Sequence, residues 1–372
     1  MRIAINARFA GLEQQEGYGR FTRGLLHNWD QFRPEDELFF LYDRRPEQPL
    51  YIPGARQQTR GPMARHPLLW KIWYDISLPA MARKAKADVL FSPDGFCSLT
   101  TRIPQVLAIH DLAFLHFPQG ISRLYQFYYR HYTPQFIRKA AHIITVSDYS
   151  KQDILRHYPE ASGKISVIYN TADPDFKPLE WEEKEKVKEE WTNGHDFFLY
   201  AGAIHPRKNL LNLLKGFSWF KHRHKSGMKL VLAGRIAWGM EDFQELLARY
   251  KYRDDVLLTG YVSDQTLQQL MGAAYALVYP SFFEGFGRPI LEAMQSSTPV
   301  ICSETGALPE IAADAAVYVS PEDPEAIGKA MGLLYKDENY RAQLIRNGRN
   351  RAAFFNRDAG SGKLAEILES VS

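Results

Sequence analysis

The chain has 372 residues, of which 45% are hydrophobic and 24% are charged, and its formal net charge is +3. This composition is that of a globular protein with a sizeable core, and the length favours two domains. Two cysteines far apart in sequence exclude a disulfide framework or a cysteine-rich metal site. No apolar run reaches the ~20 residues of a membrane-spanning helix, and the N-terminal segment is too short for a signal peptide. We therefore expect a cytoplasmic protein.

Short apolar runs alternate with helical patterns along the whole chain. Their near-continuous apolar character indicates parallel strands that are covered on both faces. The predicted strands are 2–8, 37–43, 88–93, 104–112, 142–147 and 164–170 in the first half, and 197–202, 229–235, 256–262, 276–281, 299–304 and 316–321 in the second. Helical patterns such as 209–220 complete βαβ units. The sequence therefore predicts an α/β protein with two Rossmann-like, doubly wound domains that face a cleft.

The domain boundary is predicted from a change in composition. The segment 171–178 is rich in turn residues, and 182–190 is a charge-dense helical pattern typical of a solvated face. We expect an N-terminal domain over 1–175 and a C-terminal domain over 176–345. The last segment, 346–372, is a candidate helix that packs back on the N-terminal domain.

Two loops that follow strands in the first half carry residues suited to chemistry. Gly17 and Gly19 precede a helix and would let the backbone approach a ligand closely. The third glycine of the dinucleotide-binding fingerprint is missing, so a flexible loop is the alternative. His110, with Asp111, ends an apolar strand, where a histidine can donate to a sugar hydroxyl or titrate near neutral pH. A purely structural histidine is the alternative there.

Residues 56–139 form a basic segment, with 12 Lys or Arg side chains and 4 Asp or Glu side chains. Such a local excess indicates an anionic partner. Aromatic residues alternate with the basic ones, which suits a membrane interface or sugar stacking. An amphipathic helix with its aromatic residues in the core is the alternative. We expect this segment to contact an anionic membrane surface at the inner membrane face, and we expect no nucleic-acid partner because no recognised module is present.

In the second half, Gly202 ends a strand, and Arg207 and Lys208 follow at the predicted first turn of a helix. The helix dipole disfavours cations at that position, so the pair suggests that an anion such as a phosphate binds there. A surface charge pair is the alternative. The backbone groups of Tyr261 and Val262, after the third strand of this half, are placed to contact a nucleobase.

The segment 280–294 carries two acids, Glu284 and Glu292, eight positions apart across a glycine-punctuated turn. Pro289 fits the first position of a helix, and the N–H groups near Gly287 and Arg288 would then point toward a phosphate. Glu292 is flanked by apolar residues, and a buried carboxylate needs hydrogen-bond donors, which vicinal ribose hydroxyls would supply. Helix capping with a surface acid is the alternative.

As a set, these residues resemble the retaining GT-B glycosyltransferases of family 4, including their signature of two glutamates separated by seven residues. The resemblance covers nearly the whole chain and is more specific in the second half. It rests on Gly202, 207–209, 260–263, 284–287 and Glu292, and on 17–20, 109–112 and 145–151 in the first half.

The resemblance implies that the N-terminal domain, 1–175, binds the acceptor and that the C-terminal domain, 176–345, binds the nucleotide sugar. It also implies a role for each site residue. Arg207 and Lys208 would hold the donor diphosphate, and Glu292 would bind the ribose hydroxyls. Glu284 would face the donor sugar, and His110 would contact the sugar that is transferred. The remaining donor-binding residues are the backbone donors Phe286 and Gly287, the helix-end residue Arg288, the loop residues Gly202, Tyr261 and Val262, and the closing glycines Gly17 and Gly19.

The predicted function is that of a retaining hexosyltransferase that needs no metal and no cofactor. It would move a hexose from a nucleotide-diphosphate sugar to a glycan or lipid-linked acceptor, as in bacterial surface polysaccharide assembly. The segments 17–20 and 110–112 favour mannose from GDP-mannose among the donors. Two alternatives stay open: a non-hydrolysing nucleotide-sugar epimerase of GT-B form, and a catalytically silent nucleotide-sugar-binding protein.

Overall fold

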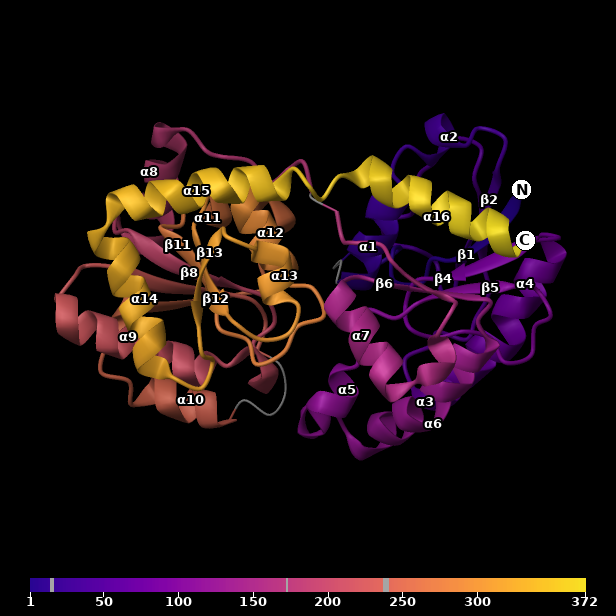
Figure 1. Cartoon of the computed structure of the whole chain (residues 1–372), viewed down its shortest axis with the longest axis horizontal. Helices are drawn as coiled ribbons and strands as arrows, with labels where there is room; N and C mark the ends of the chain where they lie inside the picture. Colours follow the sequence, from indigo (N-terminus) through magenta and orange to yellow (C-terminus); the bar gives the residue numbers. More distant parts are fainter. Residues whose placement is uncertain (14–16, 172, 237–240) are drawn as a thin grey trace. The chain divides into compact units, whose positions relative to one another are not determined.

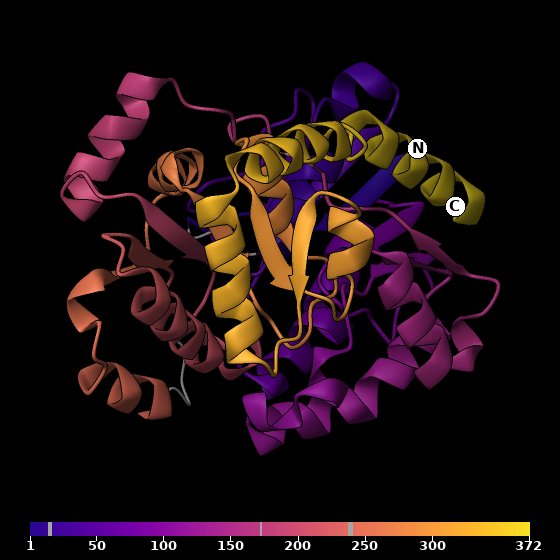
Figure 2. The ribbon, with the colours of Figure 1, turned by 60° about the vertical axis from the view of Figure 1, so that its left-hand side comes forward.

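The computed structural model describes residues 1–13, 17–171, 173–236 and 241–372, and the chain divides into two units. Unit 1 comprises Met1–Thr171 and Asn356–Ser372, and unit 2 comprises Ala172–Phe355. Each unit contains one parallel β-sheet with helices on both of its faces (Figures 1 and 2). The α/β class with two doubly wound sheets is therefore confirmed.

The sheet of unit 1 has seven strands in the order β3-β2-β1-β4-β5-β6-β7 among the residues described. They are β1 (Arg2–Asn6), β2 (Glu37–Tyr42), β3 (Arg56–Thr59), β4 (Val89–Ser92), β5 (Gln105–Ala108), β6 (His142–Thr145) and β7 (Ile165–Val167). The six predicted strands are all present, but β3 is missing from the prediction. It has the sequence Arg-Gln-Gln-Thr, because an edge strand packs against little and needs no apolar run.

The helices of unit 1 include one that comes from the far end of the chain. They are α1 (Gly17–Leu25), α2 (Trp29–Phe32), α3 (Pro67–Ile72), α4 (Leu78–Lys84), α5 (Ala113–His116), α6 (Arg123–Lys139), α7 (Asp148–His157) and α16 (Arg357–Val371), with the π-helix η1 (Trp73–Ser77) and the 3₁₀ turns η2 (Pro118–Gly120) and η3 (Pro159–Ala161). The Ser361 hydroxyl on α16 donates to the Leu25 carbonyl at 2.8 Å, which ties α16 to the end of α1 (Figure 1).

Unit 2 has a six-stranded sheet in the order β10-β9-β8-β11-β12-β13 within its described residues. The strands are β8 (Phe197–Ala201), β9 (Lys229–Ala233), β10 (Val256–Gly260), β11 (Ala276–Tyr279), β12 (Val300–Ser303) and β13 (Ala316–Val319). The helices are α8 (Trp181–Thr192), α9 (Leu210–His224), α10 (Glu241–Ala248), α11 (Asp264–Ala273), α12 (Arg288–Gln295), α13 (Leu308–Ala312), α14 (Pro324–Lys336) and α15 (Glu338–Ala352), with the 3₁₀ turns η4 (Pro206–Lys208) and η5 (Arg253–Asp255). All six predicted strands are confirmed.

The structure corrects the prediction for the end of the chain. The segment 346–372 is not one helix: it contains the end of α15, in unit 2, and all of α16, in unit 1. The break lies at Ala353–Asn356, where the Asn356 side chain accepts from the Asp358 N–H at 2.8 Å and starts the new helix.

The aromatic residues of the basic segment mostly belong to the core of unit 1. Trp70, Trp73, Tyr74, Tyr128 and Phe136 are all buried there. The interpretation of this segment as an amphipathic helix with aromatic residues in the core therefore holds for these side chains, because they fill the space between the sheet and the helices α3 and α6.

The strand order fixes where loops can meet in each unit. In unit 1 the order reverses at β1, which pairs with β2 on one side and β4 on the other. In unit 2 it reverses at β8, which pairs with β9 and with β11. The loops that leave the carboxyl ends of strands diverge at such a switch point and form a crevice suited to ligands.

Candidate functional site in two strand-end loop clusters

The switch point of unit 2 brings together the loops that follow β8 and β11. The first of these loops carries Arg207 and Lys208, and the second carries Glu284. The N–H of Phe282 donates to the Arg207 carbonyl at 2.9 Å, so the two loops are joined directly through their backbones. Residues far apart in sequence thus share one site because β8 and β11 are neighbours in the sheet.

Glu284 is caged by the two cations. Its side chain is buried, with Oε2 lying 3.0 Å from Arg207 Nη1 and Oε1 lying 2.6 Å from Lys208 Nζ. Burial alone would raise the pKa of the Glu284 carboxyl, but the cations Arg207 and Lys208 outweigh it and lower the pKa to about 2. The carboxylate therefore stays ionised at any physiological pH, and the three side chains together carry one net positive charge.

Two buried tyrosines form the floor under Lys208. The Lys208 ammonium donates to the Tyr279 hydroxyl at 2.6 Å, and the ring of Tyr279 stacks on that of Tyr200 with centroids 5.9 Å apart. Burial and the nearby Glu284 carboxylate raise the pKa of both hydroxyls well above the ordinary value, so both tyrosines stay neutral. The neutral Tyr279 hydroxyl thus fixes the position of the Lys208 ammonium by a hydrogen bond. It adds no negative charge that would neutralise the lysine.

The position of Arg207 and Lys208 corrects the sequence prediction. They lie in the 3₁₀ turn η4, and α9 begins only at Leu210. Asn209 separates the two elements with a left-handed backbone, φ 62°, and its buried amide donates to the carbonyls of Pro280 at 2.9 Å and Pro321 at 2.6 Å. Asn209 therefore fastens together the loops that follow β8, β11 and β13, a role that its sequence context does not reveal.

The helix α12 carries the second acid. Gly287 caps it with φ 95°, α12 begins at Arg288, and Pro289 occupies the second helical position rather than the first. Glu292 is buried as predicted, but a neighbour on the same helix pairs with it: Arg288 Nη2 lies 3.3 Å from Glu292 Oε1, one helical turn away. Arg288 thus offsets the burial of the Glu292 carboxylate, a role that the sequence prediction assigned to ribose hydroxyls.

Gly202 stands where two strand ends touch. Its φ is 134°, and a Cβ on Gly234, at the end of β9, would lie 1.9 Å from the Gly202 carbonyl oxygen. The backbones after β8 and β9 are therefore packed too closely for any side chain at position 234. This contact shapes the loop that leads to Arg207.

The other predicted donor-binding residues of unit 2 are spread around these loops. Tyr261 is half exposed and Val262 partly buried, directly before α11, where the Ser263 hydroxyl accepts from the Thr266 N–H at 3.1 Å. The Phe286 side chain is buried, and its ring lies edge-on to that of Phe355 at 5.7 Å. The Phe286 side chain is thus a packing residue of unit 2.

In unit 1, His110 and the glycine pair come together. Gly17 is the first residue of α1, and Gly19 is buried in the same turn. The ring of His110 packs edge-on against Tyr18 and Phe21 of that helix, with both centroids at 4.7 Å. His110 Nε2 lies 3.0 Å from the Pro93 carbonyl, which can only accept, so Nε2 carries the proton. β5 ends at Ala108, so His110 lies two residues beyond the strand.

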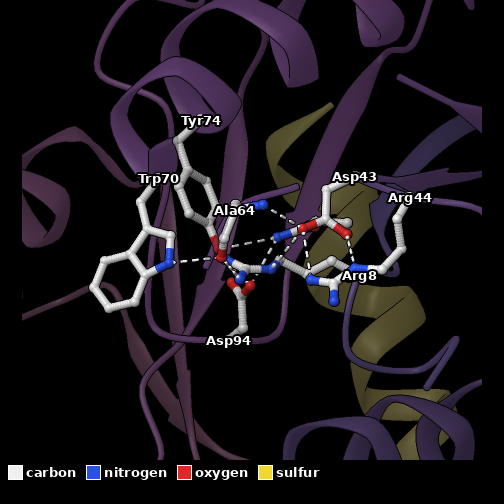
Figure 3. Close-up of polar contacts among 8 residues, drawn as sticks. Arg8, Asp43, Arg44, Ala64, Trp70, Tyr74 and Asp94 are labelled. Carbon is white, nitrogen blue, oxygen red and sulfur yellow. Dashed lines mark hydrogen bonds and ion pairs between the residues drawn. The ribbon is translucent and has the colours of Figure 1, made fainter. Parts of the chain in front are cut away.

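The switch point of unit 1 holds a buried polar network that the sequence prediction missed. Asn6 and Arg8 lie at and after the end of β1, Asp94 follows β4, and Tyr74 reaches them from η1 (Figure 3). Asn6 Nδ2 donates to Asp94 Oδ2 at 2.9 Å, Arg8 Nη1 donates to the Tyr74 hydroxyl at 3.3 Å, and that hydroxyl donates to Asp94. Burial raises the pKa of Asp94 to about 6, although Arg8 opposes the rise.

A second carboxylate, Asp43 at the end of β2, extends this network. Arg44 Nη2 lies 3.0 Å from Asp43 Oδ2, and Arg8 Nε lies 3.7 Å from the same oxygen. The Ala64 N–H donates to Asp43 Oδ2 at 2.8 Å. The sequence does place a polar residue, Asn6 or Asp94, at the end of each of the two neighbouring strands β1 and β4. Asparagine and aspartate are common after strands, however, so the pair becomes recognisable only when the strand order is known.

The predicted catalytic residues, together with three of the predicted donor-binding residues, thus form two groups. Glu284, Arg207 and Lys208 meet in unit 2, with Glu292 on the helix that follows, whereas His110, Gly17 and Gly19 meet in unit 1. No three His, Cys, Asp or Glu side chains gather closely enough to hold a metal ion in the part of the chain that the structure describes. None of the helices described combines the length and apolar character that crossing a membrane requires.

The fold and the arrangement of these loops are those of a GT-B glycosyltransferase. Residues 182–351 match the family described as glycosyl transferases group 1, and residues 25–176 match glycosyltransferase family 4. The chain is 30% identical over 251 residues to the O-antigen chain mannosyltransferase B of Escherichia coli. The aligned region covers 67% of this chain and 66% of the relative. It is 30% identical over 281 residues to the O-antigen chain mannosyltransferase RfbU of Salmonella typhimurium, which covers 74% and 73%. The chain therefore belongs to the family 4 glycosyltransferases.

Solved structures agree on the fold. The sucrose-phosphate synthase of Thermosynechococcus elongatus superimposes with a TM-score of 0.78 at 21% identity, over the full length of both chains. HepE of Anabaena, solved in complex with UDP-glucose, gives a TM-score of 0.76 at 18% identity, also over the full length of both.

Proposed function

We propose that this glycosyltransferase moves a hexose from a nucleotide-diphosphate sugar to a glycan or lipid-linked acceptor in the assembly of a surface polysaccharide. The family membership supports the reaction class. The names of the two relatives, both O-antigen chain mannosyltransferases, support the polysaccharide and favour mannose, with GDP-mannose as the donor. The UDP-glucose complex of a protein with the same fold supports a nucleotide sugar as the donor class.

The observation that carries the proposal is the cage around Glu284. Two cations and one carboxylate leave a net positive charge at the carboxyl ends of β8 and β11. A diphosphate leaving group gains negative charge as the bond to the sugar breaks, and fixed cations stabilise that charge where water is excluded. Arg207 suits the phosphate oxygens because its guanidinium donates two parallel hydrogen bonds, and Lys208 acts as a point charge.

The proposed reaction retains the configuration of the sugar. The bond between the anomeric carbon and the diphosphate oxygen breaks, and the acceptor hydroxyl oxygen attacks that carbon from the same face. The hydroxyl proton passes to the departing phosphate oxygen. Glu284 does not serve as the nucleophile in this scheme, because a carboxylate neutralised by two close cations is a poor one. Its role is to position Arg207 and Lys208 and to accept from donor-sugar hydroxyls.

The proposal has three further parts. The reaction is metal-independent, since the two cations take the place of a divalent ion at the diphosphate. It needs no cofactor other than the donor. It takes place in the cytoplasm, on the inner face of the membrane, with His110 and the α1 glycines contributing to the sugar and acceptor side.

The test has two stages. Thermal denaturation with UDP, GDP or ADP identifies the base, because a ligand that binds only the folded state raises the midpoint by mass action. We expect GDP to give the largest shift. Incubation of the matching sugar donor with membrane lipid extract or glycan acceptors then measures transfer. Interconversion of the donor sugar without transfer would identify an epimerase, and binding without turnover would identify a silent binding protein.

A further inference from the structure

The outer edge of the unit 1 sheet carries a cavity that the proposed reaction does not use. It has a volume of about 500 Å³ and lies between the edge strand β3 with the following residue, Arg60, and the helix α4, which contributes Ala80 and Lys84. β3 is the last strand of the sheet, so the cavity is separated from the switch point at β1 and β4 by the whole width of β2.

The lining of this cavity is cationic. Arg56 lies on its rim and pairs with Glu37 at 3.5 Å, whereas Arg60 and Lys84 form no ion pair among the residues described. The side chains of β3 between them are the amides Gln57 and Gln58 and the hydroxyl of Thr59. Two exposed cations with neutral donors beside them match the needs of a phosphate group.

An apolar stripe leads along the neighbouring helices to this cavity. The elements α3, η1 and α4 follow one another without a break from Pro67 to Lys84. Leu68 is 72% exposed, Ile72 40% and Ile76 57%, and they recur at every fourth residue. Ala80 and Lys84 continue the same spacing and line the cavity.

The π-helix η1 keeps the stripe straight. In an α-helix, a spacing of four residues drifts around the axis by about 40° per step, because one turn takes 3.6 residues. A π-turn takes more residues per turn and rotates the stripe back. Leu68, Ile72 and Ile76 therefore remain on one side of the helical run, with the cationic cavity one turn further on.

The helix α6 packs against α3 (Figure 1), and it also carries exposed apolar side chains. Leu124 is 47% exposed and Phe127 64%, although most other aromatic residues of α6 turn inward. Exposed basic side chains accompany them, namely Arg65, Arg123 and Arg130. Apolar side chains beside cations are the composition of surfaces that bind the headgroup region of an anionic bilayer.

We propose that this surface docks on an anionic phospholipid bilayer, with a lipid phosphate in the cavity at Arg60 and Lys84 and with Leu68, Ile72 and Ile76 in the interfacial layer. The predicted membrane contact of the basic segment is thereby narrowed to one cavity and one stripe. The docking surface rests on the proposed function only in that a lipid-linked acceptor would be presented at the same bilayer.

Vesicle binding of the full chain tests the proposal. The protein is sedimented with phosphatidylcholine vesicles and with vesicles that also contain phosphatidylglycerol, and we expect binding to the second kind only. Each cation near an anionic surface contributes roughly fivefold in affinity, so Arg60→Gln with Lys84→Gln should weaken binding by about 25-fold. Leu68→Ser with Ile76→Ser should weaken it by about tenfold or more, since apolar area is no longer buried in the interface.

Matched controls lie in unit 2. Lys186→Gln with Arg346→Gln removes two exposed cations from α8 and α15, and Leu333→Ser removes a half-exposed leucine from α14. Neither control should change vesicle binding by more than about twofold, because these residues lie outside the proposed docking surface. Equal weakening by the controls would overturn the proposal, as would equal binding to both kinds of vesicle or binding to neither.

Nucleotide binding keeps this test separate from the proposed function. GDP and UDP should stabilise the Arg60/Lys84 and Leu68/Ile76 variants as they do the unaltered chain, since those residues lie in another unit from Glu284. Loss of vesicle binding alone would thus support the docking surface. Intact nucleotide stabilisation with no vesicle binding by the unaltered chain would refute the docking surface and leave the function standing.

Discussion

At the residue scale, the chain uses two buried carboxylates in opposite ways. Glu284 is held ionised by two cations, which lower its pKa to about 2, so it is charged at neutral pH. Asp94 accepts from Tyr74 and Asn6 in a fully buried site with one arginine, Arg8, nearby, and burial raises its pKa to about 6. The difference follows from the number of cations in contact, since burial acts in the same direction on both.

The cage around Glu284 leads to a prediction for catalysis. Arg207→Ala and Lys208→Ala should each lower kcat/KM by roughly 30- to 1000-fold, corresponding to about 2–4 kcal/mol of lost transition-state stabilisation. Each variant leaves Glu284 one cation, so the fold should survive, as the thermal midpoint can verify. Arg207→Lys is the matched control, because it keeps the charge and loses only the paired hydrogen bonds. Near-normal kcat/KM in both alanine variants would contradict the assignment.

Asp94 leads to a prediction for stability against pH. Its folded-state pKa of about 6 exceeds the reference value of 3.8, so its contribution is present in acid and is lost as the pH rises through 6. Between about pH 4.5 and about pH 6.5, the unfolding free energy of the unaltered chain should fall by about 2 kcal/mol relative to that of Asp94→Asn. Urea unfolding of both proteins at the two pH values measures this difference.

For Glu284, the pH dependence of the unfolding free energy should have the opposite sign, and Glu284→Gln tests this in the same experiment. The Glu284 pKa is lowered from 4.5 to about 2, so its stabilisation is present above pH 4.5 and is lost as the pH falls toward 2. Glu284→Gln should therefore be least stable, relative to the unaltered chain, at neutral pH, because it leaves two partly buried cations uncompensated. Parallel pH profiles for the two variants would contradict both assignments.

At the element scale, the loop that enters α12 depends on a single glycine. Gly287 has φ 95°, and a Cβ there would lie 2.5 Å from Leu308 Cδ2 on α13. The backbone therefore requires glycine, because other residues rarely adopt that conformation, and a Cβ would also displace the Leu308 side chain. The start of α12 and the positions of Arg288 and Glu292 follow from this cap.

Gly287→Ala should thus lower the unfolding free energy by more than the backbone strain alone would. Gly163 has a similar φ of 79°, and a Cβ there would meet nothing within 4 Å, so Gly163→Ala isolates the strain, which is about 1 kcal/mol. We expect Gly287→Ala to lower the unfolding free energy by about 2–4 kcal/mol and to weaken nucleotide binding as well. Equal unfolding free energies for the two variants, measured in urea, would show that the contact with Leu308 is relieved without cost.

At the scale of the whole molecule, the last helix completes the first unit. The side chains of Leu364 and Leu368 on α16 are buried in unit 1, although the chain reaches them only after crossing unit 2. Leu364→Ala should lower the unfolding free energy by about 3 kcal/mol, since it leaves a cavity in a packed core. Lys363→Ala, one residue away and exposed, should change it by less than about 0.5 kcal/mol. Urea unfolding decides between these values, and equal losses would contradict the packing.

The sequence by itself determined the fold class and the family. Apolar runs predicted every strand found except β3, because buried parallel strands must be apolar along their length, whereas an edge strand need not be. Arg207, Lys208, Glu284 and Glu292 were recognisable because charged residues beside glycines at strand ends are unusual enough to stand out. These features involve residues that are close together in the chain, so they can be recognised from the sequence without the structure.

Only the tertiary structure decided which of these residues meet. The neighbouring positions of β8 and β11 bring Glu284 to Arg207 and Lys208, and those of β1 and β4 bring Asn6 to Asp94. Arg288 pairs with Glu292, because the two lie one helical turn apart. Most aromatic residues of the basic segment are buried in the core, whereas Leu68, Ile72 and Ile76 are exposed. Contacts across a sheet depend on strand order, which no local pattern encodes, and burial depends on what packs opposite.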